Sequence, residues 1–140
     1  MGFFLYSKYD TKETELVSAE VIKNENIYVL QVGVYSNKDN FKNIKINHVY
    51  EYLNDKYYVY VAMTRNKENL DKLKKYFKNQ NYEVYVKEIE VNGEYALTLK
   101  QYDLLLDEAL SDESIKTILE TSLAKFEEIA LNDKNQRITT

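Results

Sequence analysis

The chain contains a segment that occurs twice, and this repeat constrains the fold more than any other feature. Residues 28–44 align without a gap on residues 57–73, so that Asn37 falls on Asn66, 29 residues later. Each copy begins with alternating apolar residues, passes through a polar turn and enters a pattern typical of an amphipathic helix. A short internal period indicates one supersecondary unit used more than once, here a strand followed by a turn and a helix.

The segments around the repeat complete a pattern of six elements. We expect strands at Ile27–Tyr35, Val49–Leu53, Tyr57–Thr64 and Tyr82–Val91, and helices at 39–46 and Lys67–Asn79. Asn66 is the predicted N-cap of the second helix. The order β-α-β-β-α-β predicts an α+β fold of the ferredoxin-like type, with a four-stranded antiparallel sheet and both helices on one face.

Two further helices are predicted after the sheet, at Tyr95–Leu110 and Glu113–Leu131, with Ser111-Asp112 as the cap between them. Because a leucine-rich helical pair does not stand alone in water, it must cover the free face of the sheet, pack at a sheet edge or form an oligomer interface. The predicted organisation is a linker or clipped membrane-anchor end at 1–25, a sheet domain at 26–91, a helical hairpin at 94–131 and a polar tail at 132–140.

The chain has 14 tyrosines, and strict alternation along the strands places six of them on one face. The predicted helix-facing side is aliphatic and consists of Leu30, Val32, Val34, Val49, Leu53, Val59, Val61, Met63, Val84 and Val86. The opposite side then carries Gln31, Tyr35, Tyr50, Tyr52, Tyr58, Tyr60, Thr64 and Tyr85. A compositional bias toward tyrosine alone does not predict this separation.

An aromatic sheet face has three physical uses. Tyrosine rings bind the apolar C–H faces of sugars while hydroxyl and amide groups bond the sugar's polar substituents. Bases of single-stranded RNA stack on such faces, but RNA binding also needs Arg and Lys side chains that hold the phosphates. Few of these lie beside the predicted tyrosine face, and the net charge of the chain is −4. In the third use, the face is buried under the two C-terminal helices.

Nothing in the sequence has the spacing of a catalytic or metal site. There is no cysteine, and His48 is the single histidine, without a second ligand or a nucleophile nearby in sequence. The acidic pairs of the C-terminal helices lie on their polar faces. We therefore expect a non-enzyme that uses no metal and no cofactor.

The strand Leu30-Gln31-Val32-Gly33-Val34-Tyr35, together with its second copy at Val59–Thr64, resembles the opening of a SPOR domain. This small peptidoglycan-binding module occurs in bacterial cell-division and sporulation proteins and has the β-α-β-β-α-β fold. The resemblance covers about 26–91; the second copy departs from the family pattern at Ala62 and Thr64. It implies non-catalytic binding of glycan strands stripped of their stem peptides. By family position, Gln31 and Tyr35 match the signature residues of the first strand. Together with the tyrosines predicted on the same face, the expected ligand-binding residues are Gln31, Tyr35, Tyr50, Tyr52, Tyr58, Tyr60 and Tyr85.

The resemblance also implies a place at the bacterial cell envelope, on the extracytoplasmic face of the membrane, with a removed N-terminal anchor. No nucleic-acid partner is expected. The alternative function keeps the same scaffold without glycan binding: a protein-interaction module of a membrane-anchored envelope complex, which contacts other envelope proteins through Tyr95–Leu131.

Overall fold

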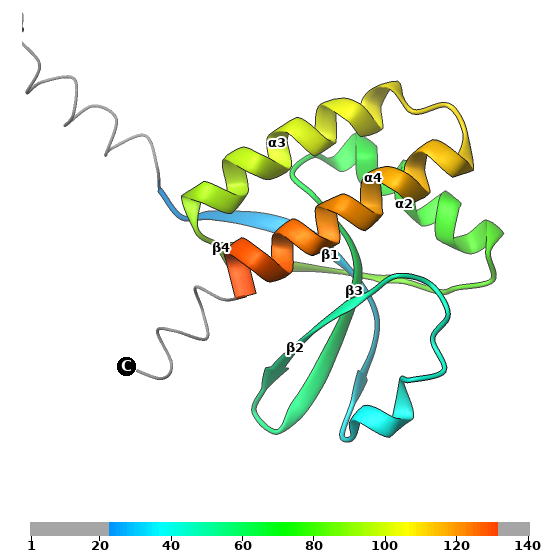
Figure 1. The fold of residues 1–140 in the computed structure, drawn as a ribbon, viewed down its shortest axis with the longest axis vertical. Helices are drawn as coiled ribbons and strands as arrows, with labels where there is room; N and C mark the ends of the chain where they lie inside the picture. Colours follow the sequence, from blue (N-terminus) through cyan, green and yellow to red (C-terminus); the bar gives the residue numbers. More distant parts are fainter. Residues whose placement is uncertain (1–22, 132–140) are drawn as a thin grey trace, which may run out of the picture.

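The computed structural model describes residues 23–131, which form a four-stranded sheet and three long helices (Figure 1). In chain order the elements are β1 (Glu25–Tyr35), η1 (Lys38–Asn40), β2 (Val49–Leu53), β3 (Lys56–Thr64), α2 (Lys67–Asn79), β4 (Tyr85–Val91), α3 (Gly93–Glu108), α4 (Asp112–Lys125) and η2 (Phe126–Leu131). The strand order is β2-β3-β1-β4, and each neighbouring pair is antiparallel. The predicted α+β fold with a ferredoxin-like sheet is confirmed.

The first helix of the repeat is reduced to one turn. We expected a helix at 39–46, but only the 3₁₀ turn η1 forms, although Asn37 caps it by accepting a hydrogen bond from the Asp39 N–H. Asn66 caps α2 in the same way, through the Asn69 N–H, and α2 continues to Asn79 as predicted. A segment of two turns does not offset the cost of helix nucleation, whereas α2 is longer and buries four large apolar side chains: Leu70, Leu73, Tyr76 and Phe77.

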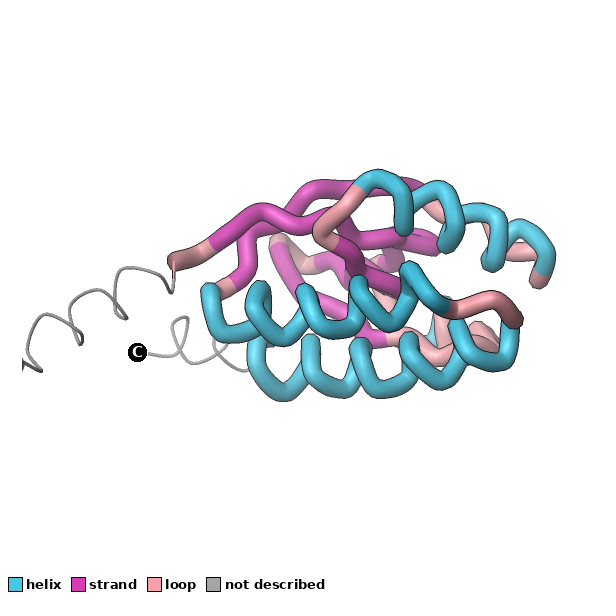
Figure 2. Tube along the Cα trace, turned by 90° about the horizontal axis from the view of Figure 1, so that it is seen from above, coloured by secondary structure: helices cyan, strands magenta, loops and turns pink. Residues whose placement is uncertain are grey.

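The α3–α4 hairpin, which we define as Gly93–Leu131, covers one face of the sheet. Figure 1 shows α3 and α4 side by side in front of the strands. The start of α3 and the end of α4 pack on Ile27, Val29 and Met63, whereas the alternate residue Leu30 packs on α2. The sheet therefore has a hairpin face and an α2 face. Figure 2 shows that the other end of the hairpin extends past the sheet and lies beside α2.

Two bulges change the faces of β1 and β3. Leu30 pairs with Ala62, Gln31 with Tyr60 and Gly33 with Val59, so Val61 and Val32 each stand without a partner in this ladder. The two extra residues lie on opposite strands, and the register is the same before and after them. From each bulge to the end of the sheet that holds the β2–β3 turn, however, every side chain of β1 and β3 lies on the face opposite to the one that strict alternation predicts.

The last turns of the hairpin hold it on the sheet. The ring of Phe126 is fully buried and meets the rings of Tyr60 and Tyr95 edge to face, with centroids 6.0 and 5.3 Å apart. Phe126 begins η2, a π-helical turn in which Ala130 and Leu131 are also buried. The predicted second C-terminal helix thus reaches Leu131 but changes its winding over the last six residues.

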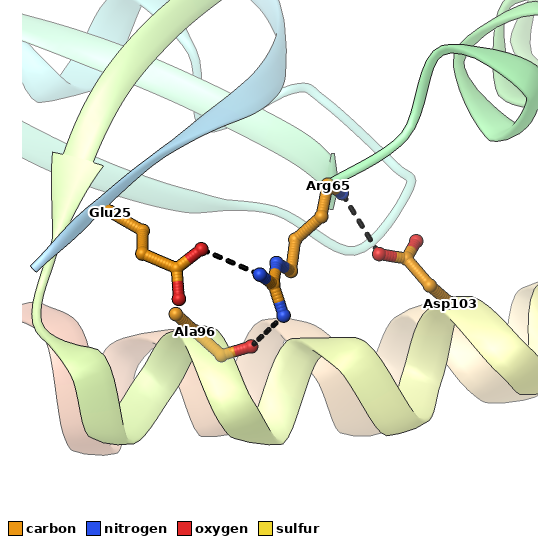
Figure 3. A network of polar contacts seen from close by, with 4 residues as sticks. All are labelled: Glu25, Arg65, Ala96 and Asp103. Carbon is orange, nitrogen blue, oxygen red and sulfur yellow. Dashed lines mark hydrogen bonds and ion pairs between the residues drawn. The ribbon is translucent and has the colours of Figure 1, made fainter. Parts of the chain in front are cut away.

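A polar cluster joins the other side of the hairpin to the sheet (Figure 3). The buried carboxylate of Asp103, on α3, accepts hydrogen bonds from the Thr64 hydroxyl, the Arg65 backbone N–H and the Asn69 side-chain amide. The Arg65 guanidinium donates to the carbonyl of Ala96 and pairs with Glu25 on β1. These bonds satisfy buried polar groups where β3 leaves the sheet, and they fix α3 against that point.

Candidate functional site

The structure divides the predicted binding residues between the two faces of the sheet. Residues that pair directly across two strands lie on the same face of the sheet. The pair Gln31–Tyr60 lies on the hairpin face, and so does Glu51, which accepts a hydrogen bond from Tyr60. Their cross-strand neighbours therefore lie on that face too. Gln31, Tyr58, Tyr60 and Tyr85 lie on the hairpin face, whereas Tyr35, Tyr50 and Tyr52 lie on the α2 face. The prediction of one continuous tyrosine face is wrong, because it assumed alternation without bulges.

On the hairpin face, the tyrosine nearest the centre of the sheet is closed to a ligand. Tyr60 has no exposed surface, and its hydroxyl donates to the buried carboxylate of Glu51 at 2.8 Å. Burial, and next the negative charge of Glu51, raise the pKa of the Tyr60 hydroxyl far above its ordinary value, so this group stays protonated. The ammonium of Lys87 lies over the ring of the neighbouring Tyr58, 4.0 Å from its centroid. Tyr60 is therefore unavailable to a ligand, whereas Tyr58 is half-buried beside Lys87.

On the α2 face, six aromatic side chains gather at the end of the sheet that α2 leaves free. We call this group the Phe41 cluster; it consists of Tyr35, Phe41, His48, Tyr50, Tyr52 and Tyr57. Phe41 is buried at the centre, with the rings of Tyr35, Tyr50 and Tyr57 5.3–5.7 Å from its own. Tyr52 stacks on Tyr57 at 4.6 Å and is the most exposed member.

The local backbone explains why these rings meet. Tyr57 pairs with Tyr52 on β2 and with Tyr35 on β1, so it is the middle of a row of three tyrosines across the sheet. Asn54 and Asp55 both have positive φ, which is the geometry of the tight hairpin turns that match strand twist. The shortened first helix leaves Phe41 free to lie on this row instead of facing a helical core.

Gly33 makes room for the Tyr35 ring, which folds back along its own strand. A Cβ atom on Gly33 would lie 2.6 Å from the Tyr35 hydroxyl oxygen and 2.8 Å from Cζ. Glycine at position 33 therefore leaves the space that the Tyr35 ring occupies. This contact explains why a glycine stands two residues before Tyr35 in the strand motif.

Gly33→Ala should displace the Tyr35 ring from Phe41 while the fold persists, because the clash is with the far end of a side chain. We expect a loss of about 1 kcal/mol or less in the free energy of unfolding, measured by urea denaturation, with a clear change in the near-UV circular dichroism of the tyrosines. In a Tyr35→Ala background the same substitution should have no effect. An equal loss in both backgrounds would contradict the assigned contact.

Positive charge borders the Phe41 cluster. The loop after β1 carries exposed Lys38, Lys42 and Lys45, with Asp39 as its acidic residue. The ammonium of Lys38 lies 5.1 Å from the centroid of the Tyr50 ring. The Tyr50 hydroxyl raises the pKa of the Lys38 ammonium, so this group is cationic at neutral pH. The surface thus combines apolar ring faces, phenol hydroxyls and an adjacent cation.

The groups needed for metal binding do not come together within residues 23–131, where three or more His, Cys, Asp and Glu side chains nowhere converge. Nδ1 of His48 donates to the backbone carbonyl of Ile46, 2.9 Å away, and its ring contacts Phe41 edge to face. His48 thus supports the aromatic cluster. Over the same residues, none of the helices has the length and apolar character needed to cross a membrane.

Comparison with family models, with curated proteins and with solved structures finds no match to this chain. The resemblance to SPOR domains therefore stays a prediction, and the function must be inferred from the geometry of the chain itself.

Sequence reasoning missed several members of the site. Phe41 lies in the segment 39–46, where only a helix was expected, and Tyr57 and Lys38 were assigned no role. One signal was available: adjacent tyrosines at 57 and 58 must point to opposite faces of a strand, so one face could not hold all the tyrosines of β3.

Proposed function

We propose that this chain is a non-catalytic binding module for peptidoglycan glycan strands and that it binds them on the Phe41 cluster. The observation that carries the proposal is the row Tyr35–Tyr57–Tyr52, which is open to solvent in part and has Tyr50 and Lys38 beside it. Tilted tyrosine rings accept the apolar faces of successive sugar rings, and their hydroxyls bond sugar substituents.

The neighbouring cation suits a glycan without stem peptides. An amidase that removes the stem peptide leaves a carboxylate on each lactyl group of the glycan. Such a carboxylate pairs with an ammonium such as that of Lys38 and gains a charge-assisted hydrogen bond. An intact strand carries an uncharged amide at the same position, so the site is expected to favour the denuded strand.

The test uses two tyrosines that match in exposure and differ in face. Tyr52 is 53% exposed in the Phe41 cluster, and Tyr85 is 55% exposed on the hairpin face. Each hydroxyl bonds a nearby carboxylate, of Asp55 or Glu83. Tyr52→Ala should weaken co-sedimentation with amidase-treated sacculi about tenfold, from roughly 1.4 kcal/mol of lost stacking, whereas Tyr85→Ala should leave it unchanged.

A third variant tests the charge. Lys38→Gln should reduce binding to amidase-treated sacculi toward the level seen with untreated ones, because it removes the group that pairs with the lactyl carboxylate. Loss of binding in Tyr85→Ala with normal binding in Tyr52→Ala would place the ligand on the hairpin face and contradict the assignment. Absence of binding to either preparation by the unchanged chain would reject the glycan function.

The second candidate function is a protein-interaction module of an envelope complex. It is favoured by the hairpin, which covers Tyr60 and so closes the middle of the sheet face that the SPOR resemblance would use. Under this function the scaffold of the sheet persists, and the hairpin supplies the surface for a partner.

A further inference from the structure

The outer surface of the hairpin exposes leucines that the fold of residues 23–131 leaves uncovered. Leu97 and Leu104 are two turns apart on α3, with 43% and 60% of their surface exposed, and Leu105 is 51% exposed beside them. Residues spaced in this way share one side of a helix. Scattered exposed leucines are ordinary, but a row on one helix face marks an interaction surface.

The row continues into a shallow hollow between the end of α3 and the start of α4. The hollow measures about 440 Å³ and is lined by Leu105, Ala109, Ile118 and Thr117, with Glu108 and Glu113 among its rim residues. Its apolar floor is the size of a few side chains. A helix laid along α3 from Leu97 toward this hollow would follow about 18 Å of surface, at 1.5 Å per residue, on which the exposed side chains of Lys100 and Gln101 separate Leu97 from Leu104.

Charge is unevenly divided between the hairpin and the rest of the described chain. Residues 93–131 contain nine acidic and three basic side chains, a net charge of −6, whereas residues 23–92 contain nine acidic and twelve basic ones, a net charge of +3. Within the described part of the chain, Glu108 and Glu113 form no ion pair. The apolar row is thus bordered by carboxylates that have no cationic partner of their own.

A second copy of this chain does not fit the surface. A two-fold axis between two α3 helices would bring Glu94, Asp107 and Glu108 of each copy against acidic residues of the other. The basic side of this chain is the outer face of α2, where the lysines are accompanied by no exposed large apolar side chain. The outer face of α2 would supply positive charge but no apolar side chain to cover the exposed leucines of α3.

We propose that the outer face of the hairpin binds a basic amphipathic helix of a partner protein. The apolar side of that helix covers Leu97 and Leu104 and fills the hollow beside Leu105, and its flanking Lys or Arg side chains pair with Glu108 and Glu113. This is the helix-in-groove mode of recognition. The inference specifies the partner for the protein-interaction function above, on which it rests, and it is independent of glycan binding.

The experiment measures binding of two synthetic helical peptides to the full chain by fluorescence anisotropy. Both peptides present leucines on one side, but lysines flank them in the first and glutamates in the second. The unchanged chain should bind the lysine peptide at least tenfold more tightly than the glutamate peptide, and added salt should weaken that binding. Leu104→Asn should weaken it at least tenfold, whereas Val86→Asn, on an exposed site of β4, should have no effect.

A charge reversal provides the sharpest control. The double variant Glu108→Lys with Glu113→Lys should lose its preference for the lysine peptide and bind the glutamate peptide better than the unchanged chain does. Equal binding of the two peptides, or equal effects of Leu104→Asn and Val86→Asn, would overturn the proposal. So would a dimer of the unchanged chain in sedimentation velocity that Leu104→Asn dissociates, because the surface would then belong to a second copy. Normal glycan binding by Leu104→Asn would separate this function from that of the Phe41 cluster.

Discussion

Phe126→Ala should lower the free energy of unfolding by about 3–5 kcal/mol, the usual cost of removing a buried phenylalanine. The ring is fully buried and contacts both Tyr60 on β3 and Tyr95 on α3, so its loss leaves a cavity between the sheet and the hairpin. In a domain of this size we expect the melting temperature to fall by roughly 10–20 °C. Urea denaturation followed by circular dichroism measures the change.

Glu127→Ala is the matched control, because Glu127 is the next residue in η2 and is exposed. It should change the free energy of unfolding by less than about 0.5 kcal/mol. A loss below about 1 kcal/mol in Phe126→Ala would mean that the hairpin is not held on the sheet as described. That result would reopen the hairpin face to a glycan, since Tyr60 would no longer be covered.

Asp103→Ala should lower the free energy of unfolding by about 3 kcal/mol. The carboxylate accepts three hydrogen bonds, and the donors from Thr64 and Asn69 are buried. Alanine leaves these donors and the Arg65 N–H with poorer partners or none, in a place that water does not reach. The loss is expected in urea denaturation, together with faster amide hydrogen exchange at Arg65.

Asp107→Ala, one turn further along α3 near the end of the helix, where the side chain is exposed, is the comparison. It should leave stability within about 0.5 kcal/mol of the unchanged chain. Asp103→Asn keeps the size of the side chain but replaces one acceptor by a donor, so its effect should fall between the two. Equal stability of Asp103→Ala and Asp107→Ala would contradict the role assigned to the polar cluster.

The fold was predictable from the repeat because each copy contains a strand followed by the N-cap residue of a helix. Asn37 and Asn66 both act as caps, and the strands before them pair with each other. The length of the first helix was not predictable from the alignment. After the cap, α2 offers Leu70, Leu73 and Phe77 to one side, whereas the first copy offers Phe41 and Ile44 but has His48 at the position of Phe77.

The binding site was predicted less well, because a face assignment depends on every residue before it. One unpaired residue in a strand moves all later side chains to the other side. Gly33 is a signal for the bulge in β1, since glycine inside a strand often marks one. Val61 gives no such signal in β3, because valine is typical of a regular strand. Tyr35, Tyr50 and Tyr52 therefore stay together as predicted, but they lie apart from Tyr58 and Tyr60.

The paired bulges at Val32 and Val61 also bear on how such a sheet changes over evolution. Because each bulge holds one residue outside the ladder, a single-codon deletion at either position would shift the strand beyond it by one step and exchange its two faces. Tyrosines would then pass from the Phe41 side to the hairpin side, or the reverse, without any substitution of the tyrosines themselves. A descendant of this chain can thus acquire a different binding surface by a change of length, while its helices keep their sequence.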